Sequence, residues 1–285
     1  KGNYDMAGIL AAERNEMKLV SPQGINAGGT AYFKLPTGLR YHLLIIKYAG
    51  ALADYPELRV VANTENVRRV SFVEQDMMNQ TDGLAAAGGF LVVPFDSLGM
   101  RIREGIEETA LNVGRPAGME PQPDEITSAE VQIDIGAGAA APALEVFATV
   151  SNAIGGGAGL VRHVVKTTRQ VGGAGEFDIQ DLDFNKPNRA LIRRAFFKTD
   201  KLDKLEVYRD NVKIFERTRA LNNRRLADGK RSQQAGWTLL DKTEDGYSGS
   251  RISTMGVQDF RFRLNMTGAE ANMPIITEYL GTLKA

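Results

Sequence analysis

Residues 130–135 read Glu-Val-Gln-Ile-Asp-Ile, and residues 259–264 read Asp-Phe-Arg-Phe-Arg-Leu. In both stretches polar and apolar side chains alternate with a period of two, which is typical of a β-strand with one buried and one exposed face. Half-exposed alternation of this kind favours antiparallel sheets over buried parallel ones. The two stretches therefore predict antiparallel sheet in both halves of the chain.

The same alternation recurs along much of the sequence. We expect further strands over Tyr32–Leu35, Tyr41–Tyr48, Leu144–Val150 and Ile275–Leu280. Helical spacing is brief and covers Ser71–Gln80, Arg217–Asp228 and Met6–Leu19. Many short strands with Gly-rich turns and few helices indicate an all-β fold of the sandwich or barrel class.

The chain also repeats itself weakly. An ungapped shift of 147 residues, from Leu58 to Leu205, lays residues 58–95 over residues 205–242. Both copies read strand, polar turn, strand and short helix, and the shift pairs apolar residues with apolar residues: Leu58 with Leu205, Val60 with Val207, Val67 with Ile214, and Phe90 with Trp237. We therefore predict two copies of one fold, with Phe90 and Trp237 buried at equivalent places.

Composition narrows the function classes. The chain has 285 residues, enough for two domains of ordinary size, and 43% of them are hydrophobic, enough for a packed core. Lys plus Arg equals Asp plus Glu at 35 each. The chain therefore has no net positive charge that would attract nucleic acid or anionic lipid. Without cysteine, disulfides, thiol nucleophiles and Cys-based zinc sites are excluded. No signal-peptide pattern or membrane-spanning stretch is expected.

Motifs that carry catalysis are weak. The Gly136–Ala141 stretch resembles a dinucleotide fingerprint, but Pro142 leads straight into another strand pattern, so a turn between strands is favoured. Gly155–Gly159 lacks the Lys-Ser/Thr of a phosphate loop and is interpreted as a flexible linker. His42 and His163 stand without any catalytic motif nearby, although a triad assembled through space stays open. We expect no enzymatic activity.

Two groups of acidic residues are candidate cation ligands, because calcium prefers clustered oxygen ligands. Neither group has EF-hand spacing, so solvated loops remain the simpler interpretation, with calcium as a possible cofactor. The candidate residues are Asp178, Asp181, Asp183, Asp241, Glu244 and Asp245.

Residues 186–231 hold 15 basic and 6 acidic residues. The expected helix within this range lacks aromatic side chains, which gives no support to base stacking with nucleic acid. A solvated or partner-facing helix is the favoured interpretation. Its partners would be the acid-rich regions 104–108 and 120–130 of a neighbouring copy.

Four stretches, taken in order, resemble the major capsid proteins of corticoviruses, the tailless icosahedral phages with an internal membrane. Ala31-Tyr-Phe-Lys-Leu-Pro-Thr-Gly38 resembles the opening of that protein. Glu130–Ile135 with Ala139–Leu144 is similar to its first domain's closing hairpin. Leu191–Lys198 and Pro274–Gly281 resemble the start and the last strand of its second domain.

The resemblance implies two tandem eight-stranded jelly-roll β-sandwiches, a double jelly roll, with a few short helices. It implies an N-terminal arm over residues 1–29, a first jelly roll over 30–154, a linker over 155–187 and a second jelly roll over 188–285. Residues 112–127 form an insertion relative to the family, expected as an exposed loop or tower.

The resemblance further implies a structural role. Homotrimers would tile an icosahedral virion shell around an internal membrane, which the arm could contact, with other virion proteins at the vertices. Assembly would take place in the host cytoplasm, with no specific nucleic-acid partner. Calcium binding belongs to the family, without ligands that transfer residue by residue. The alternative is a tandem β-sandwich module that binds carbohydrate or protein, although the single Trp237 falls in an expected core strand instead of on a binding face.

Overall fold

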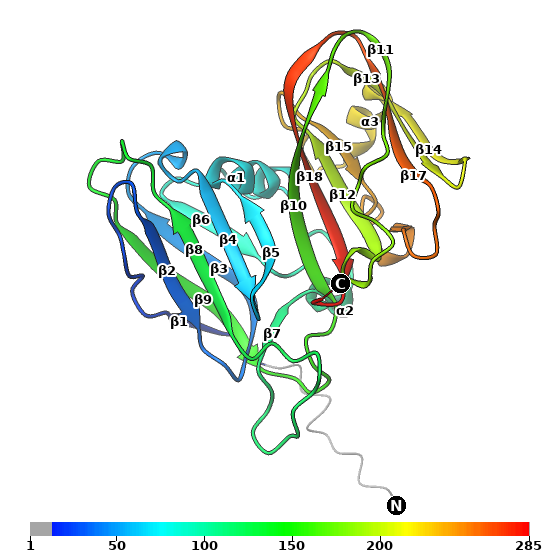
Figure 1. Ribbon diagram of the computed structural model, residues 1–285. Coiled ribbons are helices and arrows are strands. Elements are labelled where there is room, and N and C mark those ends of the chain that lie inside the picture. Colours follow the sequence, from blue (N-terminus) through cyan, green and yellow to red (C-terminus); the bar gives the residue numbers. More distant parts are fainter. Residues whose placement is uncertain (1–12, 285) are drawn as a thin grey trace, which may run out of the picture.

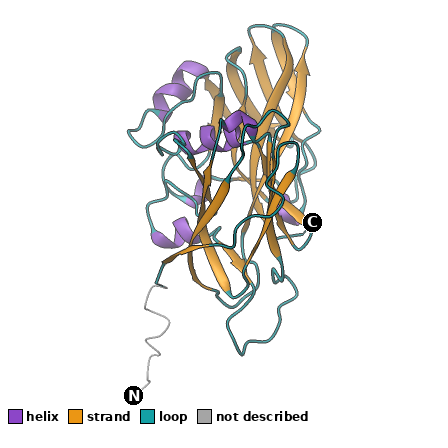
Figure 2. Ribbon diagram, turned by 90° about the vertical axis from the view of Figure 1, so that its left-hand side faces the viewer, coloured by secondary structure: helices purple, strands orange, loops and turns teal. Residues whose placement is uncertain are grey.

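The computed structural model describes residues 13–284, and these form two β-sandwiches that stand side by side (Figure 1). The first is coloured blue to green and the second green to red. Strands dominate both sandwiches, and the helices are few and short (Figure 2). The all-β prediction is confirmed.

The first sandwich consists of two facing sheets. One has the order β1-β9-β3-β6, and the short strand β7 also pairs with β3. The other has the order β2-β8-β4-β5. The strands of the first sheet are β1 Asn15–Lys18, β3 Leu39–Tyr48, β6 Phe90–Pro94, β7 Leu111–Val113 and β9 Leu144–Asn152; those of the second are β2 Thr30–Leu35, β4 Glu57–Ala62, β5 Glu65–Val70 and β8 Ala129–Asp134.

The second sandwich repeats this order strand for strand. One sheet runs β10-β18-β12-β15, with the short β16 beside β12, and the other runs β11-β17-β13-β14. Each sandwich thus has eight strands of a jelly roll and one short addition within the described residues. The strands are β10 Val161–Val171, β11 Gly175–Ile179, β12 Leu191–Phe197, β13 Leu202–Arg209, β14 Val212–Thr218, β15 Thr238–Asp241, β16 Ile252–Ser253, β17 Phe260–Met266 and β18 Glu270–Gly281.

The helices also follow the 147-residue repeat. Helix α1 spans Phe72–Thr81 and helix α3 spans Arg219–Leu226, which confirms two of the three expected helices. The side chains of Ser71 and Thr218, equivalent under the shift, accept hydrogen bonds from the first turn of their helices. The remaining helical segments are α2 Arg103–Glu107 and the 3-10 turns η2 Leu52–Asp54, η3 Pro187–Arg189 and η4 Ser248–Ser250.

The same shift relates two tight hairpins. Asn63 and Thr64 join β4 to β5 with φ of 47° and 74°, and Asp210 and Asn211 join β13 to β14 with φ of 49° and 63°. Two consecutive positive φ angles characterise the two-residue turn whose twist matches that of paired strands. The predicted polar turns therefore have one geometry in both domains.

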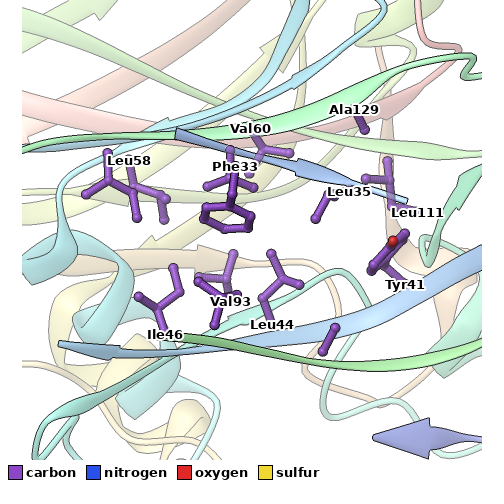
Figure 3. Close-up of a cluster of buried hydrophobic side chains, with 14 of the residues drawn as sticks. Phe33, Leu35, Tyr41, Leu44, Ile46, Leu58, Val60, Val93, Leu111 and Ala129 are labelled. Carbon is purple, nitrogen blue, oxygen red and sulfur yellow. The ribbon is translucent and has the colours of Figure 1, made fainter. Parts of the chain in front are cut away.

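The core of the first sandwich lies between its two sheets. Phe33, Leu58 and Val60 point from one sheet toward Leu44, Ile46 and Val93 of the other (Figure 3). All six side chains are buried. The alternation of β2, β4 and β8 thus results from one face that packs on this core while the other meets solvent.

The two sandwiches are joined edge to edge. Strand β5 of the first pairs in parallel with β10 of the second, at Arg68 and Val164. This contact makes one nine-stranded sheet that continues through both domains, and β5 and β10 lie adjacent in Figure 1. The domains are therefore one connected structure.

The expected linker over 155–187 is wrong for most of its length. Strands β10 and β11 occupy residues 161–171 and 175–179 and belong to the second sandwich, so the connection between the last strand of the first domain and the first strand of the second covers only residues 153–160. Gly172 and Gly173 lie in the short connection from β10 to β11, which leads from one sheet of the second sandwich to the other, and Gly175 begins β11. Glycine here marks a turn between two strands, not a tether between domains.

The expected arm over residues 1–29 also needs correction. Asn15–Lys18 forms strand β1, which pairs with β9, and Gln23 bridges Tyr32. The expected helix over residues 6–19 is wrong over this strand, and residues 1–12 lie outside the described residues. Beyond β7, the segment 114–128 is an extended connection with Met119 exposed, as expected for the insertion. No helix among residues 13–284 is long and apolar enough to cross a membrane.

Candidate assembly surface

Each sandwich has one sheet whose outer surface carries apolar side chains, and the two surfaces are equivalent in position. We call the outer surface of β10-β18-β12-β15 the covered face and that of β1-β9-β3-β6 the open face. Phe196 on the covered face lies opposite Ile276 and Leu239. Ile45 on the open face lies opposite Phe147 and Val92 in the same way.

The covered face is buried by the first domain. Met77 and Met78 of α1 and Val70 of β5 form one apolar cluster with side chains of the second domain that include Phe196, Trp237 and Ile276. Trp237 is only 8% exposed. The junction between the domains is therefore an apolar interface of the kind expected for a permanent contact.

Ion pairs cross the same junction. Arg194 on β12 contacts Asp82, just beyond α1, at 2.5 Å and Glu278 on β18 at 2.7 Å. Burial opposes ionisation of Glu278, but Arg194, Arg193 and Arg162 hold the pKa of this carboxyl well below its ordinary range. Glu278 is thus a buried carboxylate that depends on its arginine neighbours.

The open face has no such cover within the chain. Phe90 occupies the position equivalent to Trp237 but is 51% exposed, so the prediction of burial at both positions is wrong for Phe90. On the covered face, Met77 and Met78 of α1 lie in one cluster with Trp237. No helix among the described residues covers Phe90 in this way. A groove of about 310 Å³ lies here, lined by residues that include Ile45, Phe90 and Phe147.

Charged side chains border this groove. Lys18 and Lys47 contact Glu145 at 2.6 and 2.9 Å, and the Lys18 ammonium lies 5.7 Å from the centre of the Phe147 ring. The pKa of the Glu145 carboxyl falls to about 2 because both lysines hydrogen-bond it. An apolar centre with a charged rim is the anatomy of a protein–protein interface.

The edge strands of the two domains differ as the faces do: two edges are paired at the domain junction, and their equivalents in the repeat are not. Strands β5 and β10 pair with each other across the domain junction. Their equivalents in the repeat, β14 and β1, each have one strand partner among the described residues, β13 for β14 and β9 for β1. Each therefore presents an unpaired edge, which in sheet proteins is a place for a further strand to add.

Helix α3 is the equivalent of α1 but has no domain packed on its outer side. The shift that relates the helices places Leu221, Arg224 and Arg225 at the positions of Glu74, Met77 and Met78. Leu221 is 52% exposed, and both arginines are exposed. The surface that would cover an open face is thus basic and partly apolar.

A serine, a histidine and an aspartate meet beside the open face. His42 lies 2.9 Å from the Ser151 hydroxyl through Nε2 and 3.0 Å from the Asp96 carboxylate through Nδ1. The order of contacts is that of a hydrolase triad, which sequence reasoning left open. All three residues are at most 2% exposed, and Arg14 binds Asp96 from outside at 2.8 Å. The group therefore acts as a buried hydrogen-bond network that joins β3, β9 and the segment after β6.

The acidic candidates for a cation site already have partners. Asp178 contacts Arg263, Asp181 contacts Arg169, and Asp183 contacts Lys186. In the second group, Asp241 binds Arg231, Glu244 binds Arg217, and Asp245 accepts hydrogen bonds from the Tyr247 backbone and Ser250. Among residues 13–284 no group of three or more potential ligands gathers in metal-binding geometry. The structure therefore brings none of the six together as a site.

The basic stretch 186–231 finds many acidic partners inside its own chain. Arg231 pairs with Asp241, and Arg194 pairs with Glu278. The regions expected to serve a neighbour are also engaged, since Glu107 binds Arg14 and Arg40, Glu108 binds Arg251, and Glu125 binds Arg115. These three carboxylates therefore already have basic partners within the chain, and their contact with a neighbouring copy stays a prediction. Arg224 of α3 remains exposed.

Two jelly rolls in one chain, joined edge to edge, define the double jelly-roll class. The chain matches two family models, the N-terminal domain of viral coat protein P2 over residues 16–151 and its C-terminal domain over residues 161–283. The chain belongs to this viral coat protein family. It is a viral capsid protein, and its location is the virion.

Solved structures agree on the fold. The major capsid protein P2 of bacteriophage PM2 superposes with a TM-score of 0.83 at 21% identity, over 95% of this chain and 98% of that one. A chain from Sulfolobus Turreted Icosahedral Virus gives 0.66 at 9% identity, over 95% and 91%. The Faustovirus major capsid protein gives 0.57 at 7% identity, over 96% and 91%. A search of curated proteins finds no match.

Proposed function

We propose that this chain is the major structural subunit of an icosahedral shell and assembles as a homotrimer through the open face. The observation that carries the proposal is the repeat itself. One domain junction is made inside the chain, and both halves of an equivalent second junction lie exposed on the same molecule.

The proposed contact copies the contact within the chain. Strand β1 of one subunit would lie beside β14 of the next, as β10 lies beside β5, and α3 would cover the groove at Phe90 and Phe147. Such a head-to-tail contact uses two different surfaces and closes a ring only at a particular rotation. Because each chain holds two similar domains, three chains present six similar sides.

The chemistry of the two partners is complementary. Exposed Arg224 of α3 would meet the exposed aromatic rings of the open face. Arg225, which contacts Glu244 at 3.0 Å in its own chain, would lie near the Glu145 carboxylate and its two lysines. Arginine on aromatic faces and arginine–carboxylate pairs are both favourable and frequent at interfaces. The intersubunit contact is therefore expected to be more polar, and more sensitive to salt, than the methionine-covered junction inside the chain.

Native mass measurement of the purified protein tests this proposal. We expect a species of three times 31.1 kDa at micromolar concentration, with an interface well above ~1,000 Å². Phe147→Asp places an unpaired charge at the centre of the groove and should give monomer. The matched control is Thr30→Asp on β2, an exposed strand position outside the open face. A wild-type protein that stays monomeric at all salt concentrations would overturn the proposal.

Further partners are part of the same proposal. In the shell, trimers would contact other virion proteins at the vertices, and the segment before β1 would face an internal membrane. Assembly would take place in the host cytoplasm, and no catalytic step is assigned to the protein. The choice of a structural role over a carbohydrate-binding module is supported by Trp237, which is buried at the domain junction.

A further inference from the structure

Four arginines meet where the covered face joins the first domain. Arg68 comes from β5, Arg162 from β10, and Arg193 and Arg194 from β12. None of the four is more than 5% exposed. Guanidinium groups are rarely removed from water to this extent unless their charge is matched.

Two carboxylates contact this cluster. Glu278 lies 2.5 Å from Arg193, 2.7 Å from Arg194 and 4.0 Å from Arg162. Asp82 binds Arg194 through two hydrogen bonds. Two negative charges therefore face four positive ones, and the excess is two positive charges in a region closed to solvent.

The excess is concentrated on Arg68 and Arg162. Both donate hydrogen bonds to the same carbonyl oxygen, that of Pro94, which brings two like charges together on a neutral acceptor. The other contacts of Arg68 are also neutral: the Gln75 side chain at 2.7 Å and the Phe95 ring, whose centre lies 5.8 Å from the guanidinium carbon. Among the described residues, no carboxylate lies within ion-pair distance of Arg68.

Donors remain free at the same place. The Nε atoms of Arg162 and Arg193 are buried and have no hydrogen-bond partner within residues 13–284. Burial and the nearby Arg162 lower the pKa of Arg68 well below its ordinary value, and burial lowers that of Arg162 to about 10. A water molecule would satisfy a free N–H group but would leave the charge excess unchanged.

We propose that a small monovalent anion of the halide class binds between Arg68 and Arg162 and completes this interdomain cluster. An anion accepts hydrogen bonds from several guanidinium groups at once, and such charge-assisted bonds are the strong ones. A small ion suits the site because the donors are held by close-packed strands of two domains. The inference concerns stability of the chain and does not rest on the proposed trimer.

Bromide locates the site directly. Crystals of the full chain grown with sodium bromide should show an anomalous peak within hydrogen-bond reach of Arg68 and Arg162. A second crystal with sodium sulfate in place of bromide distinguishes a halide site from a general anion site. No bromide peak at the cluster, or a peak that sulfate alone produces, would overturn the assignment.

Melting experiments test the energetic role. At constant ionic strength, replacing sodium gluconate by sodium chloride should raise the melting temperature by about 2–5 °C and then saturate, as a binding equilibrium requires. Arg68→Met removes the unmatched charge, so it should abolish this chloride dependence. The control Arg263→Met breaks a half-buried pair with Asp178, far from the cluster in sequence, and should retain the full dependence. Equal melting in chloride and gluconate for the wild type, or undiminished chloride dependence in Arg68→Met, would show that the cluster binds no halide.

Discussion

The covered and open faces have the same strand order and the same register, yet they meet different surroundings. On the covered face Trp237 and Phe196 pack under Met77 and Met78 of the first domain. On the open face Phe90, at the position of Trp237, is half exposed. The strand order and register of the jelly roll therefore place an apolar face on one sheet of each domain. They do not determine which element packs on that face.

The two junctions also differ in their charges. The covered face buries Glu278 among arginines, and the equivalent strand position on the open face, by register with Ile45 and Phe147, is Thr149. Removing one partner from a buried ionic cluster strongly destabilises the fold, because a charge is left buried without its counterion. Substituting a half-buried threonine at an open surface has little effect on stability. Equivalent substitutions in the two faces should therefore have very different effects.

The largest expected effect is at Glu278. Replacing it by Gln removes the carboxylate shared by Arg193 and Arg194, which should lower the free energy of unfolding by about 4 kcal/mol because several buried positive charges lose their partner. Thr149→Val on the open face should change it by less than about 0.5 kcal/mol. Chemical denaturation of both variants measures the difference, and similar losses would mean that the faces do not differ as described.

The next effect concerns the two equivalent aromatic residues. Trp237→Ala leaves a cavity under α1 and should cost about 3 kcal/mol, whereas Phe90→Ala should cost less than about 1 kcal/mol in the monomer. Urea denaturation of dilute protein gives both values. A cost at Phe90 as large as that at Trp237 would show that the open face is covered within a single chain.

A smaller effect depends on pH and arises on β10. Burial lowers the pKa of His163 from 6.5 to about 4, and its Nε2 hydrogen-bonds the Thr282 carbonyl. Because the unfolded chain binds this proton more readily, the contribution of His163 is present above pH 6.5 and is lost as the pH falls toward 4. The expected loss between pH 7 and pH 5 is about 2 kcal/mol.

The register supplies a matched variant for this test. Strand β1 carries Asn15 at the position equivalent to His163, so His163→Asn introduces the residue of the first domain. Between pH 7 and pH 5, the free energy of unfolding of this variant should fall by about 2 kcal/mol less than that of the wild type. Unchanged pH dependence in the variant would assign the acid sensitivity to other groups.

The smallest expected effect is that of calcium. Each of the six acidic candidates already contacts a basic side chain or hydrogen-bond donors in its own chain, as Asp178 does with Arg263. We expect calcium or a chelator to shift the melting temperature of the isolated chain by less than about 1 °C. A larger shift in differential scanning fluorimetry would show that these carboxylates exchange their partners for a metal ion.

Much of the fold could be predicted from the sequence because local rules decide it. The period of two in residues 130–135 predicts a half-buried strand whatever the strand pairs with. The 147-residue shift aligns capped helices and hairpins, and these depend only on nearby residues. The strand over residues 161–171 was missed because its first half is buried without alternation and residues 166–170 in its second half are all polar. Burial at Phe90 was mispredicted because the second domain's Trp237 lies under α1, whereas Phe90 at the equivalent position is left 51% exposed within the chain.

The candidate site was less predictable for a related reason. The edges of β1 and β14 and the exposure of α3 become visible only when strand pairing is known, since sequence spacing does not say which strand lies at an edge. The arginine cluster was equally hidden, because Arg68 and Arg162 lie in different domains and share only the Pro94 carbonyl. Pairing between distant segments is therefore the information that the sequence pattern lacked.

The central claim is that the contact between subunits repeats the contact within the chain, and an engineered disulfide tests it most directly. Arg68 and Val164 pair inside the chain, and their equivalents in the repeat are Phe215 and Glu16. Because the chain has no cysteine, any disulfide in the double variant Glu16→Cys with Phe215→Cys joins introduced cysteines only. Oxidation should give a covalent trimer on a non-reducing gel, whereas Thr30→Cys with Phe215→Cys should stay monomeric. Monomer in the first variant, or equal cross-linking in both, would contradict the account.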